Sequence, residues 1–177
     1  ANEGSVAAPT ASLHFTPQLM EAIRAVGCGV EFVTLHLGTA SFLPLWNEGE
    51  EAAVEPTRPG REHGFFDTRL LSKIEETKAR GGRVIAVGTS VVRLLETVAR
   101  RESNGSGVQH FASDLFIEPG FEFRYVDAMV TNFHQPRTTH LLLVQAFMGR
   151  DLLARSYEFA LGHEFRFLSY GDGMLIL

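Results

Sequence analysis

The sequence predicts a single α/β domain over residues 1–177, built on a mainly parallel sheet with helices on both faces. Two patterns predict this class. Short, wholly apolar runs such as Val84-Ile85-Ala86-Val87 are typical of strands that are buried on both faces. Stretches with helical periodicity alternate with such runs, as in sheets whose strands are connected by helices. With 177 residues the chain can bury a sizeable core.

The first part of the chain predicts one helix, one strand and one long loop. Thr16 and Pro17 are typical of a helix start, a hydroxyl cap followed by proline, and Gly27 ends this helix. Residues 30–37 predict a strand, because apolar and polar side chains alternate there. Residues 44–64 contain three prolines and an acidic run without a sustained period, and they predict a long irregular surface loop.

The rest of the chain continues the alternation of helices and strands. Glycine-rich turns, such as Gly81-Gly82 and Gly171-Asp172-Gly173, separate the predicted elements. We expect helices over 67–80, 91–101, 138–148 and 151–161, strands over 83–87, 115–117, 125–133, 166–170 and 174–177, and a polar linker over 102–109.

Charge and cysteine content narrow the class of protein. The formal net charge of -5 gives no sign of a dedicated nucleic-acid arm. Residues 54–101 are nevertheless net basic, with ten Lys or Arg against six acids, so this segment is the one expected to face phosphate; an ordinary solvated face is the alternative. Cys28 is the only cysteine, which excludes an internal disulfide and fits a reducing cytoplasm. No apolar run approaches the ~20 residues of a membrane span, so no membrane partner is expected.

A polar turn follows the longest predicted strand. Residues 125–133 lead through Asn132 to His134, and Pro136 closes the turn before the next helix. The rim of the sheet is where open α/β proteins tend to place their chemistry. An amide and an imidazole at this rim are therefore candidates for substrate binding and proton transfer.

Two other features are candidates with simpler alternatives. Gly88 and Thr89 form a strand-to-helix turn that could hold a nucleotide group, although a plain helix cap explains the same residues. Three imidazoles, those of His14, His36 and His134, lie beside predicted strand ends or helix starts, where they could converge. No pair of histidines has the close helical spacing of a zinc site, so no metal is expected.

The last candidate is the turn at residues 169–173. The phenol of Tyr170 could stack on a base or bond a ribose, and the carboxylate of Asp172 could orient a histidine or bind hydroxyls. A tight hairpin turn through Gly171-Asp172-Gly173 would explain the same residues without a ligand.

Several motifs keep their order and spacing along most of the chain. They are Gly4 to Ala11 with Leu13-His14-Phe15-Thr16, Phe32 to His36 with Gly38-Thr39, Ala79-Arg80-Gly81 through Thr89, Val92-Arg93 with Leu95-Glu96, Asp114 to Phe116 with Pro119-Gly120, Asp127 to Pro136 with Ala146-Phe147 and Gly149, and Arg166-Phe167 with Ser169 to Asp172. As a set, these motifs resemble the carboxyl-terminal half of the S-adenosylmethionine:tRNA ribosyltransferase-isomerases.

The resemblance implies a reaction of queuosine biosynthesis. The family transfers and isomerises the ribosyl moiety of S-adenosylmethionine onto 7-aminomethyl-7-deazaguanine at the tRNA wobble position, giving epoxyqueuosine-tRNA with release of adenine and methionine. It implies a cytoplasmic enzyme with this modified tRNA as partner, no metal and no cofactor, S-adenosylmethionine being the ribosyl donor substrate. A chain of this kind lacks the family's amino-terminal β-rich portion.

The resemblance also carries over site residues. It implies catalytic roles for His134, His14, His36 and Asp172, and substrate-binding roles for Thr10, Thr16, Thr39, Gly88, Thr89, Asn132 and Tyr170. Which histidine removes the proton is left open; His134 is the hypothesis, because Asn132 on the same strand end could orient substrate beside it.

One segment departs from the family pattern. Where the family has a His-x-Met-His-Ser-Glu segment, only Glu62 falls near its glutamate, and His63 is out of register. This departure supports an alternative, a catalytically impaired paralogue or fragment that binds nucleotide or tRNA without turnover. A generic α/β enzyme using the Gly88-Thr89 turn is a third reading, but it leaves the ordered motifs unexplained.

Overall fold

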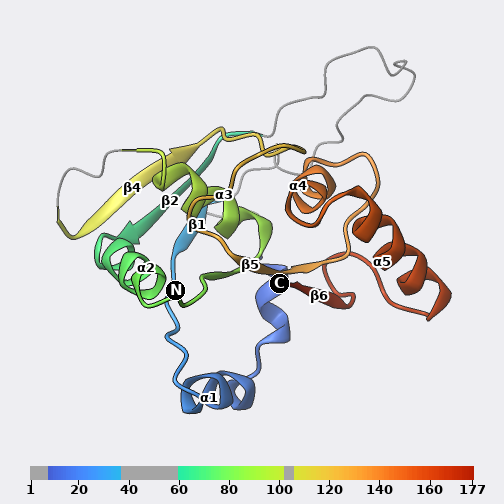
Figure 1. The fold of residues 1–177 in the computed structure, drawn as a ribbon, viewed down its shortest axis with the longest axis horizontal. Coiled ribbons are helices and arrows are strands. Elements are labelled where there is room, and N and C mark those ends of the chain that lie inside the picture. Colours follow the sequence, from blue (N-terminus) through green and yellow to red (C-terminus); the bar gives the residue numbers. More distant parts are fainter. Residues whose placement is uncertain (1–7, 37–59, 102–105) are drawn as a thin grey trace.

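A computed structural model describes residues 8–36, 60–101 and 106–177 (Figure 1). Its elements form two small sheets and their covering helices. The strands are β1 (Thr34–His36), β2 (Glu62–Asp67), β3 (Ile85–Val87), β4 (Val108–Ser113), β5 (Ala128–Asn132) and β6 (Gly173–Ile176); the helices are the 3-10 helix η1 (Thr10–His14), α1 (Pro17–Ala25), α2 (Arg69–Ala79), α3 (Thr89–Val98), α4 (Thr139–Met148) and α5 (Arg150–Gly162).

The first sheet is antiparallel, in the order β1-β2-β4. Strand β2 overlaps the loop predicted for residues 44–64, so that prediction is wrong from Glu62 onward; residues 44–59 lie outside the described residues. The physical reason is Gly64 at mid-strand, where a Cβ would lie 2.3 Å from both the Phe111 ring and the Thr34 carbonyl oxygen. Glycine reads as a turn signal in sequence, but here it permits close packing of three strands.

The second sheet has the order β3-β5-β6. Strand β3 runs parallel to β5, whereas β6 runs antiparallel to it. The α/β class is confirmed, but the mainly parallel sheet is not, because among the pairings of the described residues only that of β3 with β5 is parallel. A short apolar run has the same composition in either direction, so the sequence pattern did not fix strand direction.

Several predicted boundaries need correction. The strand expected over 30–37 is reduced to β1 in the described residues, and the linker expected over 102–109 overlaps β4, which begins at Val108. The strands expected over 115–117 and 166–170 are not strands. Residues 115–117 still bury Ile117 in the core, so their apolar pattern reports burial without strand pairing. All five predicted helices are present, with α1 capped by Thr16 as expected.

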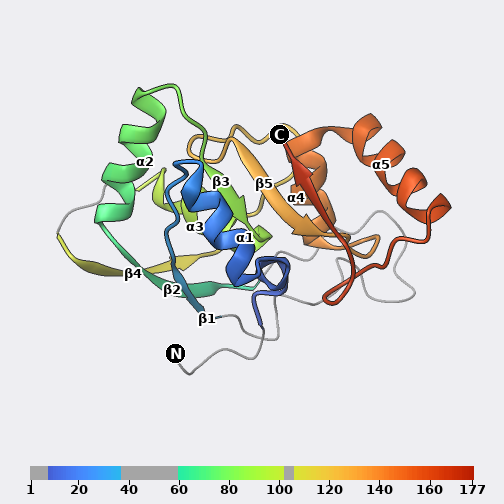
Figure 2. The same ribbon diagram turned by 90° about the horizontal axis from the view of Figure 1, so that it is seen from below.

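Helix α3 lies between the two sheets and is buried along nearly its whole length (Figure 2). Its apolar side chains join residues of both sheets in one core, including Phe66 and Phe111 from the first and Met129 from the second. This differs from the predicted single sheet covered on both faces: the helix serves as a shared layer. None of the helices within the described residues is long and apolar enough to cross a membrane.

Glu96 is a fully buried carboxylate on α3. Its oxygens accept hydrogen bonds from the backbone N–H groups of Arg124, Tyr125 and Val126 at 2.9 to 3.1 Å, and from Arg100 Nη1 at 2.6 Å. These donors satisfy a buried charge that would otherwise be strongly destabilising. The carboxylate thereby fixes the segment that leads into β5.

We expect Glu96→Ala to lower the free energy of unfolding by about 3–5 kcal/mol, because it removes the carboxylate partner of Arg100 and leaves three backbone donors without their acceptor. Urea denaturation checks this. Glu76→Ala is the matched control, since the exposed Glu76–Arg80 pair on α2 is expected to contribute less than about 1 kcal/mol. Equal losses in the two variants would contradict the structural role of Glu96.

Candidate functional site

The side-chain amide of Asn132 joins three distant segments at the end of β5. Asn132 is only 3% exposed. Its Nδ2 lies 3.1 Å from His14 Nε2 and donates to the Gly171 carbonyl at 3.4 Å, while its Oδ1 accepts from the Thr10 hydroxyl at 3.4 Å. The amide therefore ties η1 and the turn before β6 to the central strand.

This network indicates the tautomer of a neutral His14 ring. A carbonyl oxygen can only accept, so the Nδ2 side of the Asn132 amide must face Gly171. The same Nδ2 then donates to His14 Nε2, which places the proton of the neutral imidazole on Nδ1. Close approach is possible because residue 173 is glycine: a Cβ there would lie 3.0 Å from His14 Nε2.

An open pocket of about 310 Å³ lies beside this network. It brings together three of the predicted residues, and it adds one cation, Arg166, that was not among the predicted site residues. Its lining is Leu13, His14, Arg166, Ser169, Tyr170, Gly171 and Asp172. The sequence signal for Arg166 was its place in the closing motif.

The turn that carries Tyr170 is held by Asp172. The Asp172 carboxylate accepts from the backbone N–H of Arg166 at 2.7 Å, and its own N–H donates to the Arg166 carbonyl at 2.8 Å. The turn is also tied to the end of β5, because the Leu168 N–H donates to the Phe133 carbonyl at 2.9 Å. Tyr170, at the tip, is 89% exposed. In this structure Asp172 thus stabilises the turn.

His134 lies in a different environment from Asn132. Its Nε2 is 2.8 Å from the Thr131 hydroxyl, and its ring stacks on His140 with centroids 5.2 Å apart. Its backbone N–H donates to the Tyr157 hydroxyl at 2.8 Å. None of these partners lines the pocket. The expected juxtaposition of His134 with the Asn132 amide is therefore not seen, because Thr131 and Asn132 are successive residues of a strand and point to opposite faces.

Burial lowers the pKa of His134 from 6.5 to about 3, with a smaller contribution from the nearby His140. Burial likewise lowers the pKa of His140 from 6.5 to about 4, with a further contribution from the positive Arg93. Both rings are consequently neutral near neutral pH. A proton on either ring would lack the solvation that stabilises an imidazolium in water.

The other predicted site residues are dispersed. His36 lies on β1 in the first sheet, where its ring meets Phe65 edge-on at 5.8 Å. Thr16 caps α1, accepting from the Leu19 N–H at 3.2 Å, and Thr39 lies outside the described residues. The imidazoles of His14, His36 and His134 thus lie in three different environments and do not converge. No group of His, Cys, Asp and Glu in the described part of the chain is arranged to hold a metal ion.

The Gly88-Thr89 turn lies beside η1. Gly88 has φ 95°, a conformation that favours glycine, and its N–H donates to the Val130 carbonyl at 2.8 Å. A Cβ on Gly88 would lie 3.8 Å from that of Ala11, so the turn packs against the 3-10 helix that carries His14. Thr89 is buried as the first residue of α3. The start of α3 and its packing against η1 explain these contacts without a nucleotide.

A buried ion pair between α3 and β2 was not among the predicted site residues. Arg93 Nη1 lies 2.8 Å from Glu62 Oε1, and both side chains are buried. The Ser90 hydroxyl donates to the same oxygen at 3.4 Å, and Arg93 Nε donates to the Leu115 carbonyl at 3.0 Å. The resemblance had pointed to Glu62 through the altered family segment, but nothing in the sequence pattern paired it with Arg93.

Comparison with known proteins identifies the family. The family described as Queuosine biosynthesis protein matches residues 1–176. The S-adenosylmethionine:tRNA ribosyltransferase-isomerase of Chlorobaculum parvum is 50% identical over 175 residues, covering 98% of this chain and 50% of that protein. The protein of the same name from Thermotoga maritima is 47% identical, covering 99% of this chain and 50% of its own length.

A solved structure agrees with this match. The crystal structure of S-adenosylmethionine tRNA ribosyltransferase from Thermotoga maritima superposes with a TM-score of 0.75 at 41% identity, covering 94% of this chain and 51% of that one. The chain spans about half the length of the curated relatives it matches. The resemblance inferred from the motifs is thereby confirmed, and the chain belongs to the queuosine biosynthesis protein family.

Proposed function

We propose that this chain supplies the donor-binding part of a ribosyl transfer. In this proposal the ribosyl moiety of S-adenosylmethionine is moved and isomerised onto 7-aminomethyl-7-deazaguanine at the wobble position of a tRNA, with adenine and methionine released. The observation that carries it is the Asn132 amide, which holds His14 at the wall of a pocket beside Tyr170 and Arg166. S-adenosylmethionine is the donor substrate, and no cofactor or metal is proposed.

The proposed ribosyl transfer requires a base near the positively charged sulfur of S-adenosylmethionine. The sulfonium acidifies a C–H of the neighbouring sugar carbon, so a neutral imidazole can accept that proton, and adenine leaves to give an unsaturated sugar. The amine of 7-aminomethyl-7-deazaguanine then attacks this sugar, and methionine is displaced as the ring rearranges to the epoxide. His14 suits this role better than His134, because it lines the pocket. Its Nε2 lone pair accepts from the Asn132 amide, so in this proposal the amide turns away before Nε2 takes the proton. The low pKa of His134, about 3, makes that ring a weak base.

Other pocket groups suit the remaining parts of the donor. The Arg166 guanidinium can pair with the carboxylate of the methionine moiety, and the exposed Tyr170 ring can stack on adenine. The pocket volume lies at the lower end of the range of about 300–1,000 Å³ that is typical of small-molecule sites. Because the pocket is open, it leaves room for the tRNA to close it.

Binding without turnover is the second candidate. The observation that favours it is the departure from the family pattern, because only Glu62 falls near the glutamate of the family's His-x-Met-His-Ser-Glu segment and the two histidines of that segment are absent. The two candidates differ in one product: only the first releases adenine from S-adenosylmethionine in the presence of the modified tRNA.

We expect His14→Gln to lower the rate of adenine release by about 100-fold or more, the usual contribution of a general base. Chromatography of adenine released from S-adenosylmethionine, in the presence of tRNA bearing 7-aminomethyl-7-deazaguanine, checks this. His163→Gln, which removes an exposed imidazole just after the last residue of α5, is the matched control and should retain the rate. An unchanged rate in His14→Gln would remove the assignment of the base, and no adenine from the unaltered protein would favour binding without turnover.

We expect the imidazole of His134 to stay neutral as the pH falls through 6.5, because its pKa is lowered to about 3. The sign follows from linkage: the unfolded chain takes up this proton first, so the contribution of His134 to stability is full above 6.5 and is lost as the pH falls toward about 3. NMR of the ring, with its resonance assigned by its loss in His134→Gln, measures this. A titration midpoint near 6.5 would contradict the half-buried, neutral ring and would make His134 a candidate for the base again.

A further inference from the structure

The outward face of the β1-β2-β4 sheet carries a continuous group of rings. Because side chains alternate along a strand, His63 and Phe65 of β2 share the face that His36 of β1 and His110 of β4 also occupy. Phe65 pairs in register with His110, and His36 with His63. We call these four side chains, His36, His63, Phe65 and His110, the ring platform.

The rings of the platform lie against one another and remain accessible. His63 stacks on His110 with centroids 5.4 Å apart and planes at 22°, and Phe65 lies 5.3 Å from His110. His36 meets Phe65 at 5.8 Å. Phe65 is 40% exposed although it is a large apolar side chain in the middle of a sheet. An aromatic residue left open at such a position is available to a flat partner.

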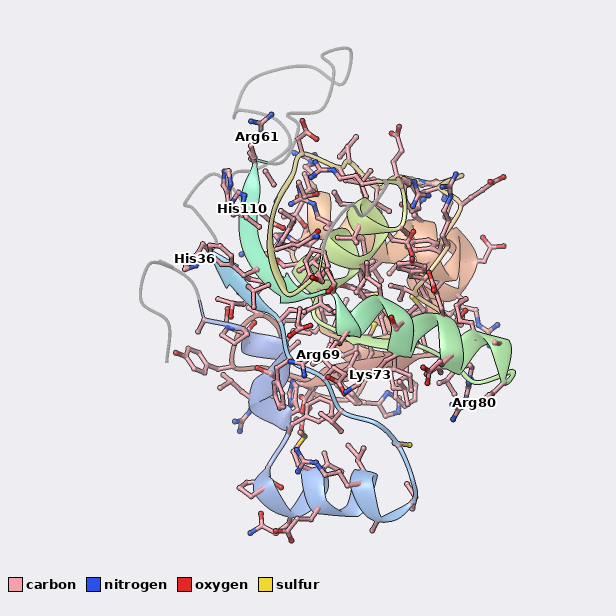
Figure 3. All side chains as sticks on the ribbon, turned by 90° about the vertical axis from the view of Figure 1, so that its left-hand side faces the viewer. His36, Arg61, Arg69, Lys73, Arg80 and His110 are labelled. Carbon is pink, nitrogen blue, oxygen red and sulfur yellow. The ribbon has the colours of Figure 1, made fainter. Side chains whose placement is uncertain are left out.

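Cationic side chains lie at both ends of this platform. Arg61 precedes β2, and Arg69 follows its last residue, with Lys73 one turn further along α2. Figure 3 shows His36 and His110 between Arg61 on one side and Arg69 and Lys73 on the other. Arg61 and Lys73 pair with Asp114 and Glu31 in exposed ion pairs, and such pairs are weak enough to exchange for phosphate. Arg69 is held more firmly, because its Nε and Nη2 both donate to Asp67.

We propose that the ring platform binds unpaired bases of an RNA loop, with the flanking cations on its phosphates. Exposed rings on an antiparallel sheet are suited to stacking on single-stranded bases, and arginines are suited to the backbone between them. The partner follows from this combination, because stacking needs a base with a free face whereas cations alone would suit any polyanion. The inference rests on the proposed function, in which the target base lies in a tRNA loop, and it assigns that loop a docking surface separate from the donor pocket.

Fluorescence anisotropy with a labelled RNA hairpin that carries an unpaired loop tests the proposal. A blunt duplex with the same stem is the comparison probe. We expect tighter binding of the hairpin, and we expect Phe65→Ala to weaken hairpin binding by about tenfold, the loss typical of one stacked base. Phe65→Tyr should restore the affinity, and His110→Ala should weaken it similarly.

Two controls make the result specific. His163→Ala removes an exposed imidazole that stacks on Phe159 at 3.9 Å, but this residue lies just after α5 and outside the ring platform, so hairpin binding should be unchanged. The salt dependence should keep its slope in Phe65→Ala and lose about one unit in Arg61→Gln, because stacking releases no counterions whereas a phosphate contact does. Circular dichroism verifies that each variant is folded, and His110→Ala replaces Phe65→Ala if the latter does not fold.

The outcomes separate this inference from the proposed function. Equal affinity for hairpin and duplex, or hairpin binding that is unchanged in both Phe65→Ala and His110→Ala, would overturn the platform even if adenine release is observed. A change of oligomeric state in Phe65→Ala without a change in RNA affinity would also overturn it, and would assign this face to a protein contact. Stacking-dependent hairpin binding by a protein that never releases adenine would support the platform while the proposed reaction fails.

Discussion

The candidate site depends on a carboxylate far from the pocket. Glu96 lies at the centre of the core and binds three successive backbone N–H groups just before β5. That contact positions the start of β5, and the strand in turn positions Asn132, its last residue. Because the Asn132 amide holds η1 and the turn at Gly171, the position of His14 follows from a charge buried on α3.

A buried ion pair links α3 to the first sheet. The Arg93–Glu62 pair joins α3 to the start of β2, which is also where the chain departs from the family pattern. Burying two charges is expensive, and the arrangement is tolerable because Arg93 has further acceptors in the Leu115 and Gly60 carbonyls. The same strand carries His63 and Phe65 outward, so one short segment contributes to the core on one side and to the ring platform on the other.

The parts of the fold that the sequence predicts are those with strong local signals. Thr16 and Pro17 locate the start of α1, and the apolar period of α3 predicts a buried helix, because capping and burial act over a few residues. Strand β2 was missed because Gly64 has a long-range role, accommodating Phe111 and Thr34 from two other strands. The direction of β6 likewise depends on pairing across the chain, which composition does not encode.

In the candidate site, too, local motifs were predicted and long-range groupings were not. Motifs identified His14, Asn132, Tyr170 and Asp172, and three of these line one pocket while the fourth supports it. The expectation that His134 would face the same space as Asn132 relied on sequence proximity, but the alternation of a strand separates neighbours. The grouping of His36 with His63 and His110 required knowledge of the register between β1, β2 and β4.

The closed turn from Arg166 to Asp172 has a thermodynamic consequence for any ligand of the pocket. Its backbone is already held at both ends by the Asp172 carboxylate and by the link from Leu168 to Phe133. A molecule that contacts Tyr170 therefore meets a preorganised loop and loses little affinity to ordering the chain. The affinity of a ligand for this pocket then depends on the contacts that the ligand makes and on the water that it displaces, because the backbone of the turn is ordered before binding.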